Sequence, residues 1–271
     1  ALFMVSLFVG IFLGQEIGFT NPLILGLFVF AIVIGAVFVR IENHQANPLL
    51  SFSLFKNGAF TMSLLCAFLI FVTNFFFNVI SPFYLENARG LKPNVAGLIL
   101  MAYPIVQVIV APIAGAISDR IGPELITFCG LILILMSQIG YMLTDLTTSL
   151  WLFTAIVGFV GFGNGIFQAP NNTIVMSAVD PENLGIAGGM NALVRNLGMV
   201  VGVSFSTTVL FSAMSHYQGT KVTTYLSGQP DVFIYGMHVS FLIAAIICAI
   251  AAMITGYRLI KRPTGPTKGE S

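Results

Sequence analysis

Long stretches of this sequence carry no charged residue. Intervals without Asp, Glu, Lys or Arg lie between Lys56 and Glu86, Lys92 and Asp119, Asp145 and Asp180, and Asp231 and Arg258. Each is longer than the roughly 18 to 20 apolar residues with which a helix crosses the hydrocarbon core of a bilayer. Since the chain of 271 residues is only 8% charged, the sequence predicts an all-α integral membrane protein embedded in a lipid bilayer.

Hydrophobic segments can be distinguished at about 1–14, 22–40, 59–83, 94–117, 123–143, 150–178, 185–212 and 232–258. The first begins within its apolar run, with neither an initiator Met nor a basic region before it. We therefore expect residues 1–14 to be a truncated helix and not a signal peptide, and the chain to be a fragment.

The connections between segments alternate in basic charge. One set holds Arg40, Lys56, Arg120, Arg258, Lys261, Arg262 and Lys268, and the other holds Arg89, Lys92 and Lys221. Cytoplasmic loops are enriched in Lys and Arg, so the first set and the C-terminus are predicted to be cytoplasmic. The tail at 261–271 is polar and rich in Pro and Gly, which is typical of disorder.

Polar residues recur at helical spacing in four of the predicted spans. Since hydrocarbon contains no water, such residues must face protein or a cavity. One interpretation is structural, with interhelical hydrogen bonds of about 0.6 kcal/mol each holding a bundle together. The other is a water-filled substrate pathway, lined by Asn74, Asn78, Tyr103, Gln107, Gln168, Asn171 and Arg195.

Arg195 is the only charged residue deep within a predicted span. Leaving an Arg at mid-bilayer costs about 2.5 to 3.5 kcal/mol, so it needs a partner or water. It either bonds backbone carbonyls freed near Pro170 or contacts substrate or a gate. No Asp or Glu lies at membrane depth in this chain, so a carboxylate proton relay would need residues from elsewhere.

Glycines spaced by four residues mark faces on which helices can approach closely. They occur in GFVGFGNG at 158–165, in GIAGG at 185–189, and as Gly198 with Gly202. Pro82, Pro104, Pro112 and Pro170 lie within or at the ends of spans. Such prolines kink helices and free carbonyls, as is common in transporters.

The short turn GAISDRIGPELI at 115–126 holds an Asp and an Arg between two spans. It resembles the loop between the second and third helices of each half of major facilitator superfamily transporters. In that family the loop is a latch that favours one access state. The resemblance implies latch roles for Gly115, Asp119, Arg120 and Gly122, with Asp180 or Glu182 as the acid that Arg120 meets. The family's basic pair after the second glycine is here Pro123 and Glu124. The alternative is that the Asp and Arg only enforce topology.

Two further stretches, NPLLSFSLFKNGAF at 47–60 and GFGNGIFQAPNN…TTVL at 161–210, resemble the C-terminal portion of fourteen-helix drug:proton antiporters. The resemblance implies two extra central transmembrane helices at 1–46, the first truncated, and a cytoplasmic interfacial linker at 47–57. A major facilitator-type six-helix C-terminal domain at 58–260 and the tail at 261–271 would follow. The segment at 47–57 is too apolar for a solvated loop and too short to span, which also favours a helix in the headgroup region.

The predicted function is export of lipophilic or cationic drugs by proton-driven alternating access in a bacterial cell membrane. This chain would supply the C-terminal half and work with a missing N-terminal half. The alternatives are export of another small metabolite and a non-transporting membrane scaffold. An enzyme is not expected, because His44, His216 and His238 are isolated from one another and from acid pairs. The net charge of +1 offers no nucleic-acid surface, and no metal or other cofactor is expected.

Overall fold

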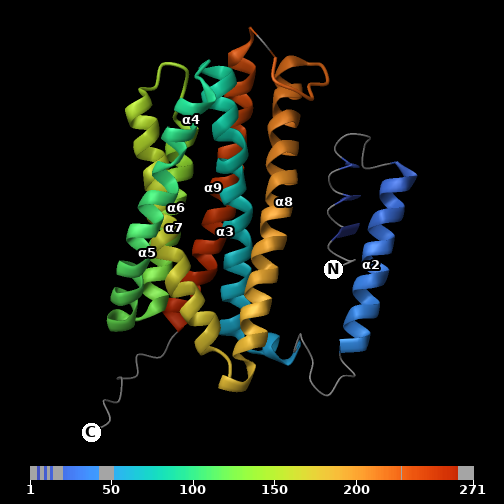
Figure 1. Cartoon of the computed structure of the whole chain (residues 1–271), viewed down its shortest axis with the longest axis vertical. Helices are drawn as coiled ribbons and strands as arrows, with labels where there is room; N and C mark the ends of the chain where they lie inside the picture. Colours follow the sequence, from blue (N-terminus) through green and yellow to red (C-terminus); the bar gives the residue numbers. More distant parts are fainter. Residues whose placement is uncertain are drawn as a thin grey trace.

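The computed structural model describes residues 5–6, 9–10, 13–14, 21–42, 52–226 and 228–261. Its elements are α2 (Pro22–Glu42), η1 (Phe52–Lys56), α3 (Gly58–Phe83), η2 (Tyr84–Ala88), α4 (Pro93–Leu100), α5 (Ala102–Ile121), α6 (Pro123–Met142), α7 (Leu150–Ser177), η3 (Pro181–Asn183), α8 (Leu184–Gln218) and α9 (Pro230–Lys261) (Figure 1). Within these ranges, 6 helical stretches are long and apolar enough to cross a membrane. They coincide with the six spans predicted between residues 58 and 260, so the all-α membrane fold is confirmed.

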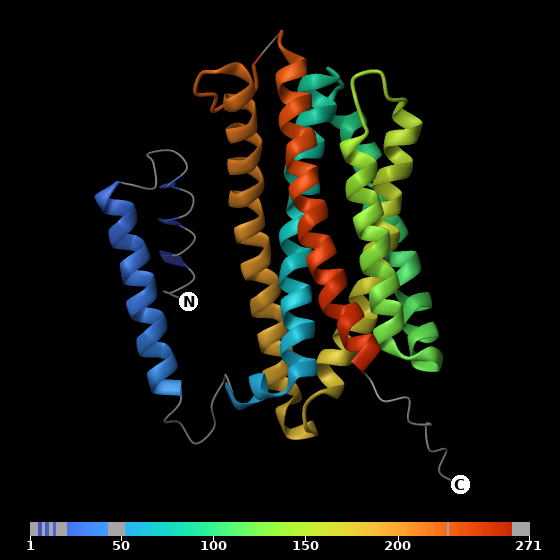
Figure 2. The ribbon, with the colours of Figure 1, turned by 180° about the vertical axis from the view of Figure 1, so that it is seen from behind.

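The N-terminal helix α2 stands apart from the others. It is apolar from Pro22 to Val37, a shorter stretch than the six spans. Among the described elements it contacts no other helix, and Figures 1 and 2 show it on the α8 side of the bundle. Most of the predicted first segment at 1–14 lies outside the described residues, as do the N-terminal part of the linker and the tail from residue 262.

Helix α3 occupies the centre of the bundle. It packs against α7, α8 and α9, while α5 packs mainly on α7 and α6 bridges α7 and α9. In its most apolar stretch, the α3 span is 61% buried inside the protein. The α4–α5 span, at the edge of the bundle, is 6% buried in its corresponding stretch. The remaining surface of α4 and α5 is largely apolar, as a helix exposed to lipid requires.

Glycines bring the helices into close contact. A Cβ atom placed on Gly202 of α8 would lie 2.8 Å from the Val72 carbonyl oxygen and 2.8 Å from Phe75 Cβ on α3. On α7, a Cβ at Gly165 would lie 3.1 Å from the Gln107 carbonyl oxygen on α5. Gly198, four residues before Gly202, also meets α3, and Gly161, four residues before Gly165, also meets α5. The prediction from four-residue glycine spacing is therefore confirmed for these two pairs, and it is wrong for Gly185 and Gly189, where a Cβ would meet no atom within 4 Å.

The span predicted as one helix at about 94–117 is broken at Met101 into α4 and α5. Pro104 explains the position, because it has no N–H to donate to the carbonyl of Leu100 one turn earlier. Pro82 acts similarly near the end of α3, where a single π-helical turn, η2, follows. Here the Arg89 N–H donates to the Tyr84 carbonyl at 2.9 Å.

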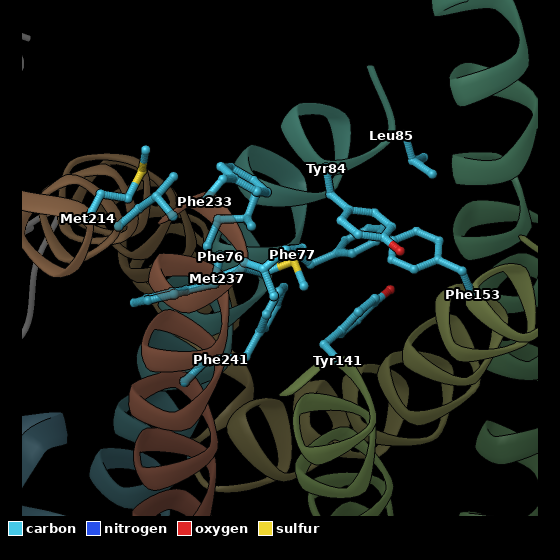
Figure 3. Packing of buried hydrophobic residues seen from close by; sticks show 14 of the residues in the cluster. Phe76, Phe77, Tyr84, Leu85, Tyr141, Phe153, Met214, Phe233, Met237 and Phe241 are labelled. Carbon is cyan, nitrogen blue, oxygen red and sulfur yellow. The ribbon is translucent and has the colours of Figure 1, made fainter. Parts of the chain in front are cut away.

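An aromatic cluster fills the bundle near the α6–α7 loop (Figure 3). The rings of Tyr141 and Phe241 stack at 4.6 Å and those of Tyr84 and Phe153 at 4.8 Å between centroids. Each such pair contributes about 0.5 to 1.5 kcal/mol beyond its buried area. The cluster joins α3, α6, α7 and α9 at this end, so it fixes the helices on which the polar residues lie.

Polar contacts close this end of the bundle around the α6–α7 loop. The Tyr84 hydroxyl donates to the Asp145 carbonyl at 2.6 Å, and Arg89 Nη1 donates to the Thr148 carbonyl at 2.6 Å. His238 Nε2 lies 2.7 Å from the carbonyl oxygen of Thr144. His238 thus forms a hydrogen bond within the wall of the bundle.

Candidate functional site

The polar residues predicted to line a pathway separate into a buried group and an accessible group. Asn74 is 4% exposed and Asn171 is 2% exposed. Asn78 and Arg195 are exposed, and Tyr103, Gln107 and Gln168 are half-buried. Burial alone therefore divides the predicted set into residues enclosed by helices and residues that a solute can reach.

Within the buried group, Asn74 on α3 forms an amide pair with Asn164 on α7. Asn74 Nδ2 donates to Asn164 Oδ1 at 2.7 Å, and Asn164 Nδ2 donates back to Asn74 Oδ1 at 3.0 Å. Asn164 Nδ2 also donates to the Val160 carbonyl at 3.0 Å. These contacts match the structural interpretation of the sequence pattern, in which amides join helices.

The accessible group contains two further amide pairs. Gln107 Nε2 on α5 donates to Gln168 Oε1 on α7 at 3.3 Å. Asn191 Nδ2 on α8 donates to Asn172 Oδ1 on α7 at 2.8 Å. Asn172 was not among the predicted pathway residues, although it lies one helical turn after Gln168. The two pairs link three helices through side chains that stay accessible.

The Asn172–Asn191 bond sets the register between α7 and α8, which run in opposite directions (Figure 1). Gln168 lies one turn before Asn172, and Arg195 lies one turn after Asn191. Antiparallel helices place these two residues at the same level. We call Gln107, Gln168, Asn172, Asn191 and Arg195 the accessible polar band.

A hollow of about 410 Å³ opens beside the band, between α3 and the broken α4–α5 span. We call it the α3–α4 hollow, and its lining is Phe77, Asn78, Pro82, Gly97, Leu100, Met101, Tyr103 and Pro104. The rings of Phe77 and Tyr103 lie 5.4 Å apart at 40°. Tyr103 is one turn before Gln107, so the hollow and the band share a face of α5.

The predicted latch residues lie at the opposite end from the aromatic cluster. Gly122 adopts φ +98° between α5 and α6, a conformation that glycine adopts readily. Asp119 and Arg120 end α5 with exposed side chains, and Asp180 and Glu182 are exposed at the α7–α8 connection. Arg120 forms no ion pair with Asp180 or with Glu182 in this conformation, so the predicted latch partners are not paired here.

The ion pair that the structure does record at this end was not predicted. Arg258 Nη2 on α9 lies 2.6 Å from Glu124 Oε1 on α6, and Arg258 Nη1 donates to Ser63 Oγ on α3 at 2.9 Å. A second hollow, of about 520 Å³, is lined in part by Glu124 and Arg258. One sequence signal could have indicated this ion pair. Glu124 is an acid in the first turn of a membrane helix, at a position where the resembled family has a basic residue.

The described residues form no cluster of side chains that could hold a metal ion. No group of three or more His, Cys, Asp and Glu side chains gathers there. Cys66 and Cys248 are buried and Cys129 is exposed, each as a free thiol. The arrangement instead offers amides, aromatic rings and one cation along an accessible face, which suits reversible binding of a solute.

Known proteins share this sequence pattern. Residues 1–203 match the profile described as the Major Facilitator Superfamily. The chain is similar to the riboflavin transporter RibZ of Clostridioides difficile, with 28% identity over 77% of this chain and 44% of that protein. It is also similar to the multidrug resistance protein Stp of Mycobacterium tuberculosis (25%, over 74% and 37%) and the quinolone resistance protein NorB of Staphylococcus aureus (26%, over 77% and 45%).

The chain spans less than half the length of these three curated relatives. The family profile nevertheless covers most of it, including α2 and the spans from α3 to α7. The six apolar spans agree with that match. The chain therefore belongs to the Major Facilitator Superfamily of membrane transporters.

Proposed function

We propose that this chain is the C-terminal portion of a bacterial exporter that moves lipophilic compounds, drugs among them, by proton-driven alternating access. The names of Stp and NorB, which refer to drug resistance, support this choice. In this proposal the two helices before residue 47 are the central pair of a fourteen-helix transporter. A six-helix N-terminal half would complete the transport path.

The observation that carries the proposal is the pairing of an accessible polar band with an aromatic hollow on one side of the bundle. Phe77 and Tyr103 offer ring faces, and Asn78 offers an amide at the rim of the α3–α4 hollow. Ring faces bind lipophilic solutes by dispersion and bind cations with about 0.5 to 2 kcal/mol. A face turned toward lipid alone has no need of the five polar side chains of the band.

Alternating access assigns separate roles to the remaining residues. The two halves would rock about the solute, so that it is exposed to each side in turn. Gly115, Asp119, Arg120 and Gly122 would act as the latch that holds one state, with Asp180 or Glu182 meeting Arg120 in that state. Since the acids of α3–α9 lie at the helix ends and in the loops, the proton-coupling carboxylates would come from the N-terminal half.

Ethidium efflux from energised cells tests the proposal. Cells would express this chain alone, and then together with the N-terminal half of a similar transporter. We expect efflux only from the pair, and a loss of at least half of the rate in Tyr103→Ala. The matched control is Val108→Ala, at a side chain on α5 that is 73% exposed and outside the hollow. A folded, membrane-inserted pair that moves no lipophilic compound would overturn multidrug export.

Export of another small metabolite is the second candidate, and the similarity to a riboflavin transporter favours it. The same cells distinguish the two functions when riboflavin is supplied beside ethidium. Riboflavin movement without ethidium movement would select the metabolite exporter. Self-association without flux of any solute would instead select the scaffold alternative.

A further inference from the structure

We infer that the accessible polar band binds the carboxylate of an aromatic substrate, and that the site selects anionic aromatic compounds over cationic ones. The inference rests on the proposed function as a small-molecule exporter and names the charge of its preferred substrate. It follows from where the charges of the described bundle lie, from the partners of Arg195, and from the orientation of the band's amides.

The acids of α3 to α9 all lie at the ends of the bundle. Glu86, Asp145 and Asp231 occupy η2, the α6–α7 loop and the start of α9 at one end. At the other end, Asp119 lies in the last turn of α5, Glu124 lies in the first turn of α6, and Asp180 and Glu182 lie in the α7–α8 connection. None of these seven side chains lines the α3–α4 hollow or belongs to the band. A cationic solute would therefore meet no opposite charge on this face.

Arg195 supplies positive charge at the level of the band. It lies eleven residues after Leu184, or about 16 Å along the helix at 1.5 Å per residue. Its side chain is exposed and makes no ion pair or hydrogen bond with the part of the chain that the structure describes. An Arg within a span is costly until an anion or water compensates it. The carboxylate of a substrate is such an anion.

The amides on α7 add hydrogen-bond donors at the same place. Gln168 and Asn172 both accept a hydrogen bond through their side-chain oxygens. Their NH₂ groups take no part in these two bonds, so each can donate to a carboxylate oxygen. Gln168 is level with Arg195 across the space between α7 and α8. A guanidinium with a neighbouring amide donor matches the two oxygens of a carboxylate.

The α3–α4 hollow accounts for the aromatic part of the substrate. Tyr103 borders the hollow and lies one turn, about 5 to 6 Å, from Gln107 in the band. Gln107 is bonded to Gln168, so aromatic and polar contacts follow one another along the same face. A planar ring held against Phe77 and Tyr103 leaves its carboxylate on the side of the band.

Binding of two matched probes tests the inference. The purified chain in nanodiscs would be titrated with radiolabelled 2-naphthoate, which is anionic, and 2-naphthamide, its neutral analogue. We expect Arg195→Gln to weaken naphthoate binding about ten- to hundredfold and to leave naphthamide binding unchanged. Arg195→Lys, which keeps the charge, should recover part of the loss. Lys221→Gln, a charge removal in an exposed loop, serves as the control.

Three outcomes would overturn the inference. They are equal binding of the two probes, an equal loss of both in Arg195→Gln, and tighter binding of ethidium than of naphthoate. An equal loss of both probes would assign Arg195 to structure, or to an acid of the other half. The efflux assay separates the two proposals, because ethidium export together with equal binding of naphthoate and naphthamide keeps the exporter and removes the carboxylate site.

Discussion

Asn74 and Asn164 exchange two hydrogen bonds between side chains that are 4% and 1% exposed. Each amide oxygen accepts from the other amide, and Asn164 Nδ2 donates in addition to the Val160 carbonyl. The pair also holds α3 against α7, two helices that otherwise share few contacts. The buried amides of this family member therefore join the helices of the bundle, whereas we propose that the accessible amides bind solute.

Removing one member of this pair is expected to cost more than removing both. Asn74→Leu or Asn164→Leu leaves a buried amide without its partner, at about 1 to 2 kcal/mol. The double variant replaces both amides with apolar side chains of similar volume and should regain much of that loss. Thermal unfolding of the four proteins in detergent gives the coupling energy, and additive single effects would contradict the pairing.

Gly202→Ala is expected to destabilise the α3–α8 contact. The new Cβ would lie 2.8 Å from backbone and side-chain atoms of α3, so the helices must separate. We expect a loss of about 1 to 3 kcal/mol, measured as a lower thermal unfolding midpoint. Gly189→Ala on the same helix meets no atom within 4 Å and is the control. Equal midpoints for the two variants would remove close approach as the reason for Gly202.

Breaking the Glu124–Arg258 pair is expected to loosen the junction of α3, α6 and α9. The side chains are 7% and 16% exposed, so Arg258→Met leaves a buried carboxylate at a cost of about 3 kcal/mol. Combining it with Glu124→Leu should restore most of the stability, because no buried charge then remains. Asp119→Asn, at an exposed carboxylate near the same end, should change the midpoint little. A double variant no more stable than Arg258→Met would argue against the pair.

Asp145 is expected to order its loop at neutral pH and to release it only in strong acid. The Thr147 hydroxyl and N–H, together with the Thr148 hydroxyl, donate to the Asp145 carboxylate and lower its pKa below the ordinary 3.8. With a lowered native pKa, the stabilisation is fully present above the unfolded value and is lost as pH falls through the native one.

Nuclear magnetic resonance of the Thr147 amide as a function of pH reports this titration directly. We expect its midpoint below 3.8. Asp145→Ala should abolish the titration and leave the amide signal in its low-pH position throughout. A midpoint at or above the ordinary value would show that the threonines do not hold the carboxylate in solution.

The sequence predicted the spans because the absence of charge over 25 or so residues has one main physical solution in a bilayer. It also predicted the glycine contacts of Gly161, Gly165, Gly198 and Gly202, since spacing by four defines a helix face. The break at Met101 was not placed, although Pro104 was noted. A proline in the first turns of a helix and one that interrupts a longer helix look the same in sequence.

The candidate site was harder to predict than the fold. Periodicity identified Asn74, Gln107 and Gln168 as facing inward, but it cannot say which amide another helix will cover. That depends on the register between helices, which the Asn172–Asn191 and Gln107–Gln168 bonds reveal. The Glu124–Arg258 pair joins residues 134 positions apart, and no local pattern links them.

The central place of α3 has a consequence for biogenesis. α3 is made before α7, α8 and α9, the three helices that pack against it, and Asn164 follows Asn74 by 90 residues. A ribosome that has released α3 into the membrane must synthesise two more spans before the matching amide emerges. During that interval the polar face of α3 is bare, so nascent chains that stop before α7 present an uncovered amide to the insertion machinery and to membrane proteases.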